Sequence, residues 1–109
     1  MLEAIVGSAA AERVLLYLQA YEEAYGREIA SALGLAQSQV QKQLQKLESG
    51  GVLVSRLTGR VRIYTWNLRN PLIPSLRSLF QSAFDALPRT QQQKYFRGRR
   101  RPRRSGKAL

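Results

Sequence analysis

The sequence predicts a mainly α-helical fold with a small β-hairpin, an α+β domain. Two helical patterns, over residues 27–33 and 37–48, are joined by a short turn that contains a glycine. The apolar period then changes from about 3.6 residues to 2 over residues 52–66, which is typical of two paired strands. Residues 72–87 return to a helical period. Together these observations predict a helical domain that carries a single hairpin.

The composition restricts both the size of the core and the chemistry. The 109 residues, 44% of them hydrophobic, are enough for one compact domain with a modest core. The chain has no cysteine and no histidine, so disulfides, thiolate or imidazole metal sites and histidine-dependent catalytic triads are excluded. The seven acidic residues are scattered and form no visible pair of carboxylates. We therefore predict a protein that is not an enzyme and that holds no metal or cofactor.

The net charge of +11 is distributed unevenly. Residues 1–88 contain nine basic and seven acidic residues, whereas residues 89–109 contain nine basic residues and no acidic one. No apolar run approaches the roughly 18 residues that a membrane span requires, and the N-terminus lacks the basic-then-apolar pattern of a signal peptide. We expect a cytoplasmic protein that is associated with the nucleoid and has no membrane partner.

The first long helix is expected to start after Ser8, a good N-cap, and to run to about Tyr21. Its apolar residues cover more than one face of the helix. One interpretation is a first helix that is buried on all sides, and the other is a helix that also packs against a second copy of the chain. The apolar residues are Val14, Leu15, Leu16, Tyr17, Leu18 and Tyr21.

The next two helices have the spacing of a helix-turn-helix. Residues 27–33 form the first, Gly34 is expected to end it in a left-handed conformation, and the second begins near Gln37. Ala36 stands where a capping side chain is usual. Its lack of an acceptor should cost the start of the helix about 1 kcal/mol.

The second of these helices has an unusual surface. Val40, Leu44 and Leu47 recur at i, i+4 and i+7 and predict one stripe that faces a core. Most of the remaining positions carry amide, hydroxyl or lysine side chains, which suit base edges in the major groove of DNA. The alternative is a solvated helix that happens to be rich in glutamine. The predicted base-contacting residues are Gln37, Ser38, Gln39, Gln41, Lys42, Gln45 and Lys46.

Residues 52–57 and 61–66 alternate in polarity around a short turn and predict a hairpin. We expect its arginines to cluster at the tip, where they can reach a phosphate backbone or a minor groove. A purely structural alternative is an edge whose charge discourages strand pairing. A helix-turn-helix followed by a basic hairpin is a winged helix-turn-helix. The predicted wing contacts are Arg56, Thr58, Gly59, Arg60 and Arg62.

Residues 71–88 predict an amphipathic helix, since Pro71 and Pro74 are tolerated in a first turn. Its long apolar stripe either folds back on the first helix or pairs with the same helix of a second copy in a two-fold dimer. We favour the homodimer, because three helices and a hairpin already close the core of residues 1–70. The predicted dimer contacts are Leu72, Leu76, Leu79, Phe80, Ala83, Phe84 and Leu87.

Residues 89–109 predict a disordered basic tail beyond the domain of residues 1–70 and the helix of residues 71–88. Such a tail attracts nucleic acid without regard to sequence. Tyr95 and Phe96 among the cations suit stacking on unpaired bases, so RNA remains an alternative partner. The predicted non-specific contacts are Arg97, Arg99, Arg100, Arg101, Arg103 and Arg104.

Residues 2–79 resemble the ArsR-type winged-helix regulators. The motifs that carry the resemblance are Arg27-Glu28-Ile29-Ala30, Leu33-Gly34-Leu35, Gln37-Ser38-Gln39-Val40, Gly50-Gly51-Val52-Leu53 and, in the wing, Arg56, Gly59, Arg60 and Tyr64. More closely, Val6-Gly7-Ser8 and Asn70-Pro71-Leu72-Ile73-Pro74 are similar to the winged-helix modules that accompany small prokaryotic nucleotidyltransferases.

The resemblance implies sequence-specific binding to double-stranded DNA by a dimer, often as a repressor. Metal sensing, which occurs in many ArsR-type relatives, is not implied here because the chain lacks cysteine and histidine. The predicted function is therefore a DNA-binding transcriptional regulator, a repressor. Two alternatives stay open: an RNA- or ribonucleoprotein-binding winged helix dominated by the basic tail, and a protein-interaction module for a partner nucleotidyltransferase.

Overall fold

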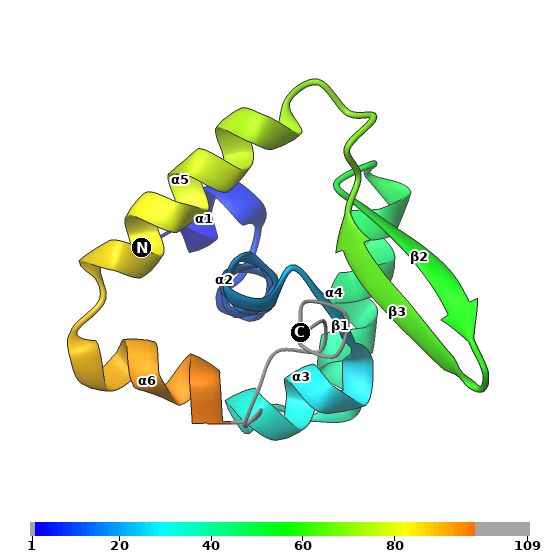
Figure 1. The fold of residues 1–109 in the computed structure, drawn as a ribbon, viewed down its shortest axis with the longest axis horizontal. Coiled ribbons are helices and arrows are strands. Elements are labelled where there is room, and N and C mark those ends of the chain that lie inside the picture. Colours follow the sequence, from blue (N-terminus) through cyan, green and yellow to red (C-terminus); the bar gives the residue numbers. More distant parts are fainter. Residues whose placement is uncertain (1, 98–109) are drawn as a thin grey trace, which may run out of the picture.

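Helix α2 (Ala9–Tyr21) lies at the centre of the computed structural model, which describes residues 2–97 (Figure 1). Its N-cap is Ser8, as predicted, and the Ser8 hydroxyl accepts a hydrogen bond from the Ala11 backbone N–H at 3.0 Å. The chain's own elements cover most of α2, which favours the first of the two interpretations, a helix buried within its own domain. Its buried residues are Ala10, Ala11, Val14, Leu15, Leu16, Tyr17, Leu18 and Tyr21.

Six helices and three strands make up the part of the chain that the structure describes. None of these helices is long and apolar enough to cross a membrane. Besides α2, they are α1 (Glu3–Val6), β1 (Glu23–Tyr25), α3 (Gly26–Leu33), α4 (Gln37–Ser49), β2 (Leu53–Thr58), β3 (Val61–Trp66), α5 (Ile73–Ala86) and α6 (Arg89–Arg97).

The three strands form one antiparallel sheet in the order β1-β3-β2. The predicted hairpin is confirmed as β2 and β3, with Val54 opposite Thr65. Strand β1 was not predicted; it joins the other side of β3, with Ala24 opposite Tyr64. The chain enters β1 through Glu22, which has φ 74° and is the only non-glycine residue with positive φ in the described chain. The Thr65 hydroxyl donates to the Glu22 carbonyl at 2.7 Å and holds this turn against the sheet.

Helices α3 and α4 form the predicted helix-turn-helix. Gly34 ends α3 with φ 68°, the left-handed conformation that its position requires. Ala36 precedes α4 and makes no side-chain cap, as expected. Val40 and Leu44 are fully buried and fix the inner side of α4 against the core.

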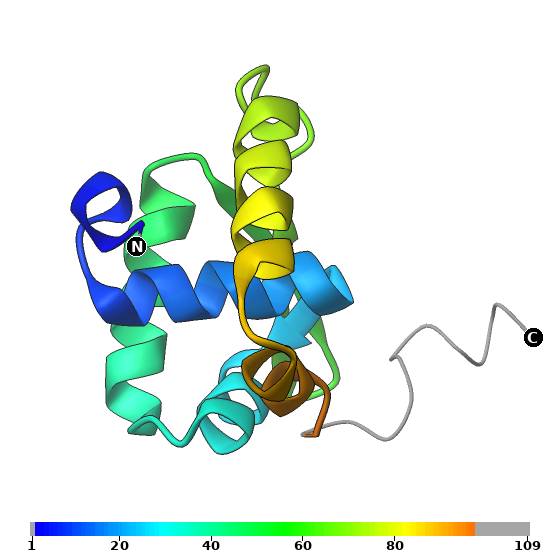
Figure 2. The same cartoon turned by 90° about the vertical axis from the view of Figure 1, so that its left-hand side faces the viewer.

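Helix α5 folds back over α2, and Figure 2 shows the two helices crossing. The preference for a dimer made by its whole stripe is wrong, because Phe80, Ala83 and Phe84 are buried in the chain's own core. The Phe80 ring lies 6.5 Å from Trp66. Two members of the stripe, Leu76 and Leu87, are half-buried and pack against the same core.

The two exposed members of the α5 stripe are Leu72 and Leu79, whose exposed fractions are 72% and 39%. Leu72 is the N-cap of α5, and Leu79 lies within the helix. On the inner side, the Arg77 guanidinium stands 5.5 Å from the centre of the Trp66 ring and its Nε donates to Gln19 at 3.1 Å. These contacts fasten α5 to both the sheet and α2.

The prediction of a disordered tail from residue 89 onward is wrong for residues 89–97, which form α6. Tyr95 is 7% exposed, and its ring meets Phe84 edge-to-face at 5.7 Å. The Gln92 amide donates to the Leu87 carbonyl at 2.9 Å. Since Tyr95 is packed in the core, it is not available to stack on bases. The predicted contacts at Arg99, Arg100, Arg101, Arg103 and Arg104, and the side chains of Phe96 and Arg97, lie outside the described residues.

Candidate nucleic-acid interface

The outer side of α4 is a polar stripe. Val40 and Leu44 are buried where α4 packs against α2, so the opposite side of the helix faces away from the core. The exposed side chains include no acidic group in the first three turns of the helix. The predicted contact residues that are exposed here are Gln37, Ser38, Gln39, Lys42, Gln45 and Lys46.

Gln41 differs from the other predicted contact residues because it is half-buried and bonded within the chain. Its amide Nε2 donates to the Tyr64 hydroxyl of β3 at 3.2 Å. Its Oε1 lies against Gly26, where a Cβ would approach this oxygen to 2.9 Å. Gln41 therefore bridges α4 to the hairpin, and Gly26 leaves the space that this bridge needs.

A cationic groove separates the N-terminal half of α4 from the hairpin, and its volume is about 550 Å³. Figure 1 shows why it forms, since β2 and β3 run beside α4 and their tip lies at the same end of the molecule as the start of α4. Three arginines and no acidic residue line it. The lining residues are Tyr25, Gly26, Arg27, Gln37, Gln41, Arg60, Val61, Arg62 and Tyr64.

The predicted cluster of three arginines at the tip of the hairpin is wrong for Arg56. In the register of the hairpin Arg56 is opposite Ile63, whereas Arg62 is opposite Leu57. Since neighbouring residues of a strand point to opposite faces, Arg56 and Arg62 emerge on opposite sides of the sheet. Arg56 pairs there with Glu23 of β1 at 3.1 Å. Only the other side of the hairpin adds arginines to the groove.

A second bridge connects α4 to the hairpin near the other end of the helix. The Ser55 hydroxyl of β2 donates to Glu48 at 2.7 Å and accepts from Arg62 at 3.0 Å. The carboxylate of Glu48 is thus used within the chain and holds Arg62 in place through Ser55. Together with the Gln41–Tyr64 contact, this chain of hydrogen bonds fixes the angle between the hairpin and α4.

Several residues that line the groove were not among the predicted DNA contacts. Arg27 belongs to the first turn of α3, and it reaches the groove only because α3 packs beside the start of α4. Tyr25 and Tyr64 line the groove from two paired strands. Thr58 and Gly59, which were predicted to contact DNA, are exposed at the tip, and Gly59 has φ 63°, which suits a glycine at this turn. Within residues 2–97 no cluster of acidic side chains could hold a metal ion.

Comparisons with known proteins show the fold. No family model and no curated protein matches the sequence. The structure is similar to the adhesin competence repressor AdcR of Streptococcus pyogenes, with a TM-score of 0.54, 19% identity, and coverage of 84% of this chain and 72% of AdcR. It is also similar to a double mutant of ZitR from Lactococcus lactis, with a TM-score of 0.51, 19% identity, and coverage of 78% of this chain and 66% of ZitR. A third match is a single mutant of ZitR, with a TM-score of 0.51, 18% identity, and coverage of 79% and 66%.

At this level of identity the likeness establishes a winged helix-turn-helix, mainly helical with a small three-stranded sheet. These neighbours support the winged-helix part of the resemblance noted in the sequence, and they give no support to its ArsR-type or nucleotidyltransferase-associated part.

Proposed function

We propose that this chain is a transcriptional regulator, a repressor, that binds double-stranded DNA with sequence specificity. One observation carries the proposal: the exposed polar stripe of α4 and the cationic groove adjoin each other, and no acidic residue lines the groove. A winged helix-turn-helix supports the same function, since its second helix is of a size and shape that fit the major groove.

The six exposed residues of α4 are proposed to read the bases. Glutamine pairs with adenine through both amide atoms, and lysine meets guanine or a phosphate. Gln41 has a different proposed role, because its amide is already bonded to Tyr64 and wedged against Gly26. We assign it to positioning the hairpin relative to α4 and not to base contact.

The groove arginines are proposed to bind the phosphate backbone beside the base-reading helix. Arg27, Arg60 and Arg62 reach one groove from two sides, which suits a DNA strand passing between α4 and the hairpin. Arg56 is expected to contribute less, because Glu23 offsets its charge. The arginines of residues 97–104 are proposed to add affinity that does not depend on sequence.

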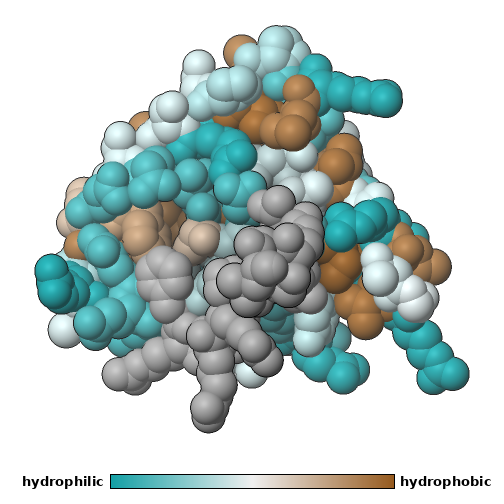
Figure 3. Space-filling view, viewed as in Figure 1, coloured by the Kyte–Doolittle hydropathy of each residue, from teal (hydrophilic) through white to brown (hydrophobic). Residues whose placement is uncertain are grey.

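A homodimer is proposed to place two copies of α4 on one duplex, with half-sites about 34 Å apart. Hydrophobic atoms gather at the top of Figure 3, over the segment between β3 and α5. Leu68 and Leu72 of this segment are 77% and 72% exposed, and Leu79 extends the apolar surface along α5. Of the predicted dimer contacts, Leu72 and Leu79 are therefore kept in the proposal, and Leu68 is added to them.

The proposal is tested by enriching random duplexes with the purified full chain and then measuring variants on the enriched site. Lys42→Ala should alter the preferred sequence, whereas Arg62→Ala should weaken binding to all duplexes and lower the salt slope by about 1. Arg89→Ala is the control, because Arg89 is an exposed cation of α6 that lines neither the groove nor any other cavity described below. No enrichment, or equal losses for Lys42→Ala and Arg89→Ala, would contradict base reading. Preferential retention of single-stranded RNA over duplex DNA would favour the RNA-binding alternative.

A further inference from the structure

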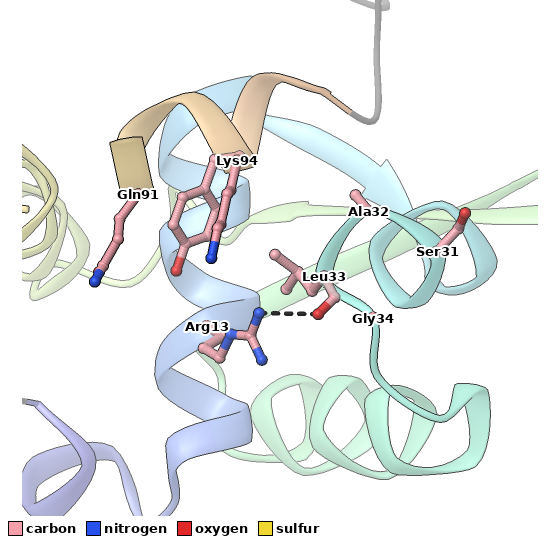
Figure 4. Close-up of a pocket in the computed structure, with 8 residues that line it drawn as sticks. Arg13, Ser31, Ala32, Leu33, Gly34, Gln91 and Lys94 are labelled. Atoms are coloured by element: carbon pink, nitrogen blue, oxygen red, sulfur yellow. Dashed lines mark hydrogen bonds between the residues drawn. The ribbon is translucent and has the colours of Figure 1, made fainter. Parts of the chain in front are cut away.

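A second cavity lies away from the groove, between α2, the end of α3 and α6 (Figure 4). Its volume is about 540 Å³, within the range of roughly 300–1,000 Å³ that is typical of small-molecule sites. The proposed DNA surface does not use it. The lining residues are Arg13, Ser31, Ala32, Leu33, Gly34, Gln91, Lys94 and Tyr95.

The polar part of this cavity is cationic and rich in donors. Arg13 comes from α2 and Lys94 from α6, and Figure 4 shows both side chains directed into the space between the helices. One N–H of Arg13 donates to the Leu33 carbonyl at 2.9 Å, which fixes the guanidinium in place. The guanidinium also hydrogen-bonds the Tyr95 side chain. Since a guanidinium has five N–H groups, these two contacts leave others for a ligand. No acidic residue lines the cavity.

Another part of the lining is apolar. Ala32 and Leu33 form an aliphatic surface at the end of α3, and the Tyr95 ring closes the side formed by α6. Burial raises the pKa of the Tyr95 hydroxyl above its ordinary value, although the neighbouring Arg13 guanidinium opposes the shift. The hydroxyl is therefore neutral; it accepts from Arg13, and Glu12 nearby adds to the rise of its pKa. Donors and cations on one side and aliphatic groups on the other suit an anion that has an apolar body.

We propose that this cavity binds a small organic anion, a carboxylate on a short aliphatic body. The carboxylate lies between Arg13 and Lys94, and the aliphatic body lies on Ala32 and Leu33. The occupied site also touches Gly34, the turn that leads into α4. A bound ligand thus joins α6 to the turn of the helix-turn-helix and alters the affinity for DNA. This effect on DNA affinity rests on the proposed function, whereas the binding of the anion does not.

The test is a titration of the ¹⁵N-labelled full chain with hexanoate at constant ionic strength, followed by NMR. Acetate supplies the carboxylate without the aliphatic body, and hexanamide supplies the body without the charge. We expect saturable shifts of the Ala32, Leu33 and Gly34 amides with hexanoate, and at most weak, non-saturating shifts with the other two compounds. Equal responses to hexanoate and acetate would show general attraction to a cationic protein and would overturn the proposal.

Two variants of α6 make the test specific. Lys94→Gln should weaken hexanoate about tenfold or more, because it removes a charge-assisted contact. Arg89→Gln removes the same charge from the same helix outside the cavity, and its affinity should equal that of the unaltered chain. Both side chains are exposed, so both variants are expected to fold. Equal affinities of the two variants would overturn the site. Hexanoate that binds as expected but leaves DNA affinity unchanged would overturn the coupling to α4 alone.

Discussion

Tyr64→Phe removes a single oxygen and tests whether Gln41 holds the hairpin against α4. Tyr64 is 2% exposed, and its hydroxyl accepts from the Gln41 amide at 3.2 Å. A neutral hydrogen bond contributes about 0.5–1.5 kcal/mol net, and 3.2 Å is the long end of the usual N–H···O range. Gln41 is only half-buried, so water can replace the lost partner. We therefore expect the free energy of unfolding to fall by about 0.5–1 kcal/mol.

Urea unfolding gives this quantity as a shift of the midpoint at an unchanged m-value. A double-mutant cycle with Gln41→Ala isolates the contact, and we expect a coupling energy of about 0.5–1 kcal/mol. Gln45→Ala is the matched control, since Gln45 is an exposed glutamine of the same helix and should show no coupling to Tyr64→Phe. Additive effects of Gln41→Ala and Tyr64→Phe would refute the bridge.

The same pair of variants distinguishes positioning from base reading. If Gln41 positions the hairpin, both Gln41→Ala and Tyr64→Phe weaken binding to every duplex and leave the preferred sequence unchanged. If Gln41 reads a base, only Gln41→Ala changes the preferred sequence. Enrichment of random duplexes with each variant measures this difference directly.

Three further variants test the fold. Phe80→Ala should lower the free energy of unfolding by about 3–5 kcal/mol in urea, because Phe80 is fully buried between α5, α2 and the sheet; a loss below 1 kcal/mol would contradict the packing of α5. Glu22→Gly should raise the free energy of unfolding by up to about 1 kcal/mol. Relief of the positive φ of Glu22, about 1–3 kcal/mol, outweighs the conformational entropy that glycine loses on folding and the loss of the exposed ion pair with Arg77. Glu22→Gln keeps the backbone strain and is the control. Tyr95→Phe tests the pH dependence of stability, because burial raises the pKa of Tyr95 in the folded chain. The stability that depends on the neutral hydroxyl is complete below the pKa of the unfolded chain, about 10, and is lost as the pH rises through the pKa of the folded chain. The difference in unfolding free energy between the unaltered chain and Tyr95→Phe should be constant below pH 10 and should change above it, and a constant difference throughout would be inconsistent with burial of the hydroxyl.

Local patterns in the sequence were sufficient to predict the helix-turn-helix and the hairpin. Gly34 signals the turn because its left-handed conformation is set by a few neighbouring residues, and Val40 and Leu44 mark the inner side of α4 by their spacing alone. Strand β1 is three residues long, which is too short to show an alternation. It forms because one edge of β3 is left unpaired by β2 and can accept a second strand. That edge exists only once the hairpin has folded, so the local sequence does not reveal it.

The apolar stripe of α5 predicted burial correctly but not the surface that buries it. A period of 3.6 residues says which side of a helix avoids water and does not distinguish the chain's own α2 from a second copy. Helix α6 has no such stripe. Its buried residue is Tyr95, and the residues around it in the sequence are mostly polar. Its charge therefore suggested disorder, and the contact between Tyr95 and Phe84 depends on the fold.

The polar stripe of α4 could be predicted because it is one helix surface. The groove could not, because Arg27 and Arg62 are 35 positions apart and meet only after the hairpin packs beside α4. The pairing of Arg56 with Glu23 likewise requires β1, which the sequence did not reveal. The register of the β2–β3 pair then decides which arginines lie on the same side of the sheet.

The enclosure of α2 by elements from both ends of the chain has a consequence for synthesis on the ribosome. Helix α2 is complete at residue 21, but its cover is finished only when Phe80, Phe84 and Tyr95 have emerged. At about 5–20 residues per second, several seconds pass in which a nascent chain displays leucine and tyrosine side chains that later become the centre of the molecule. A message truncated before α5 would make that interval permanent, and its product would aggregate or be degraded before it reached any target.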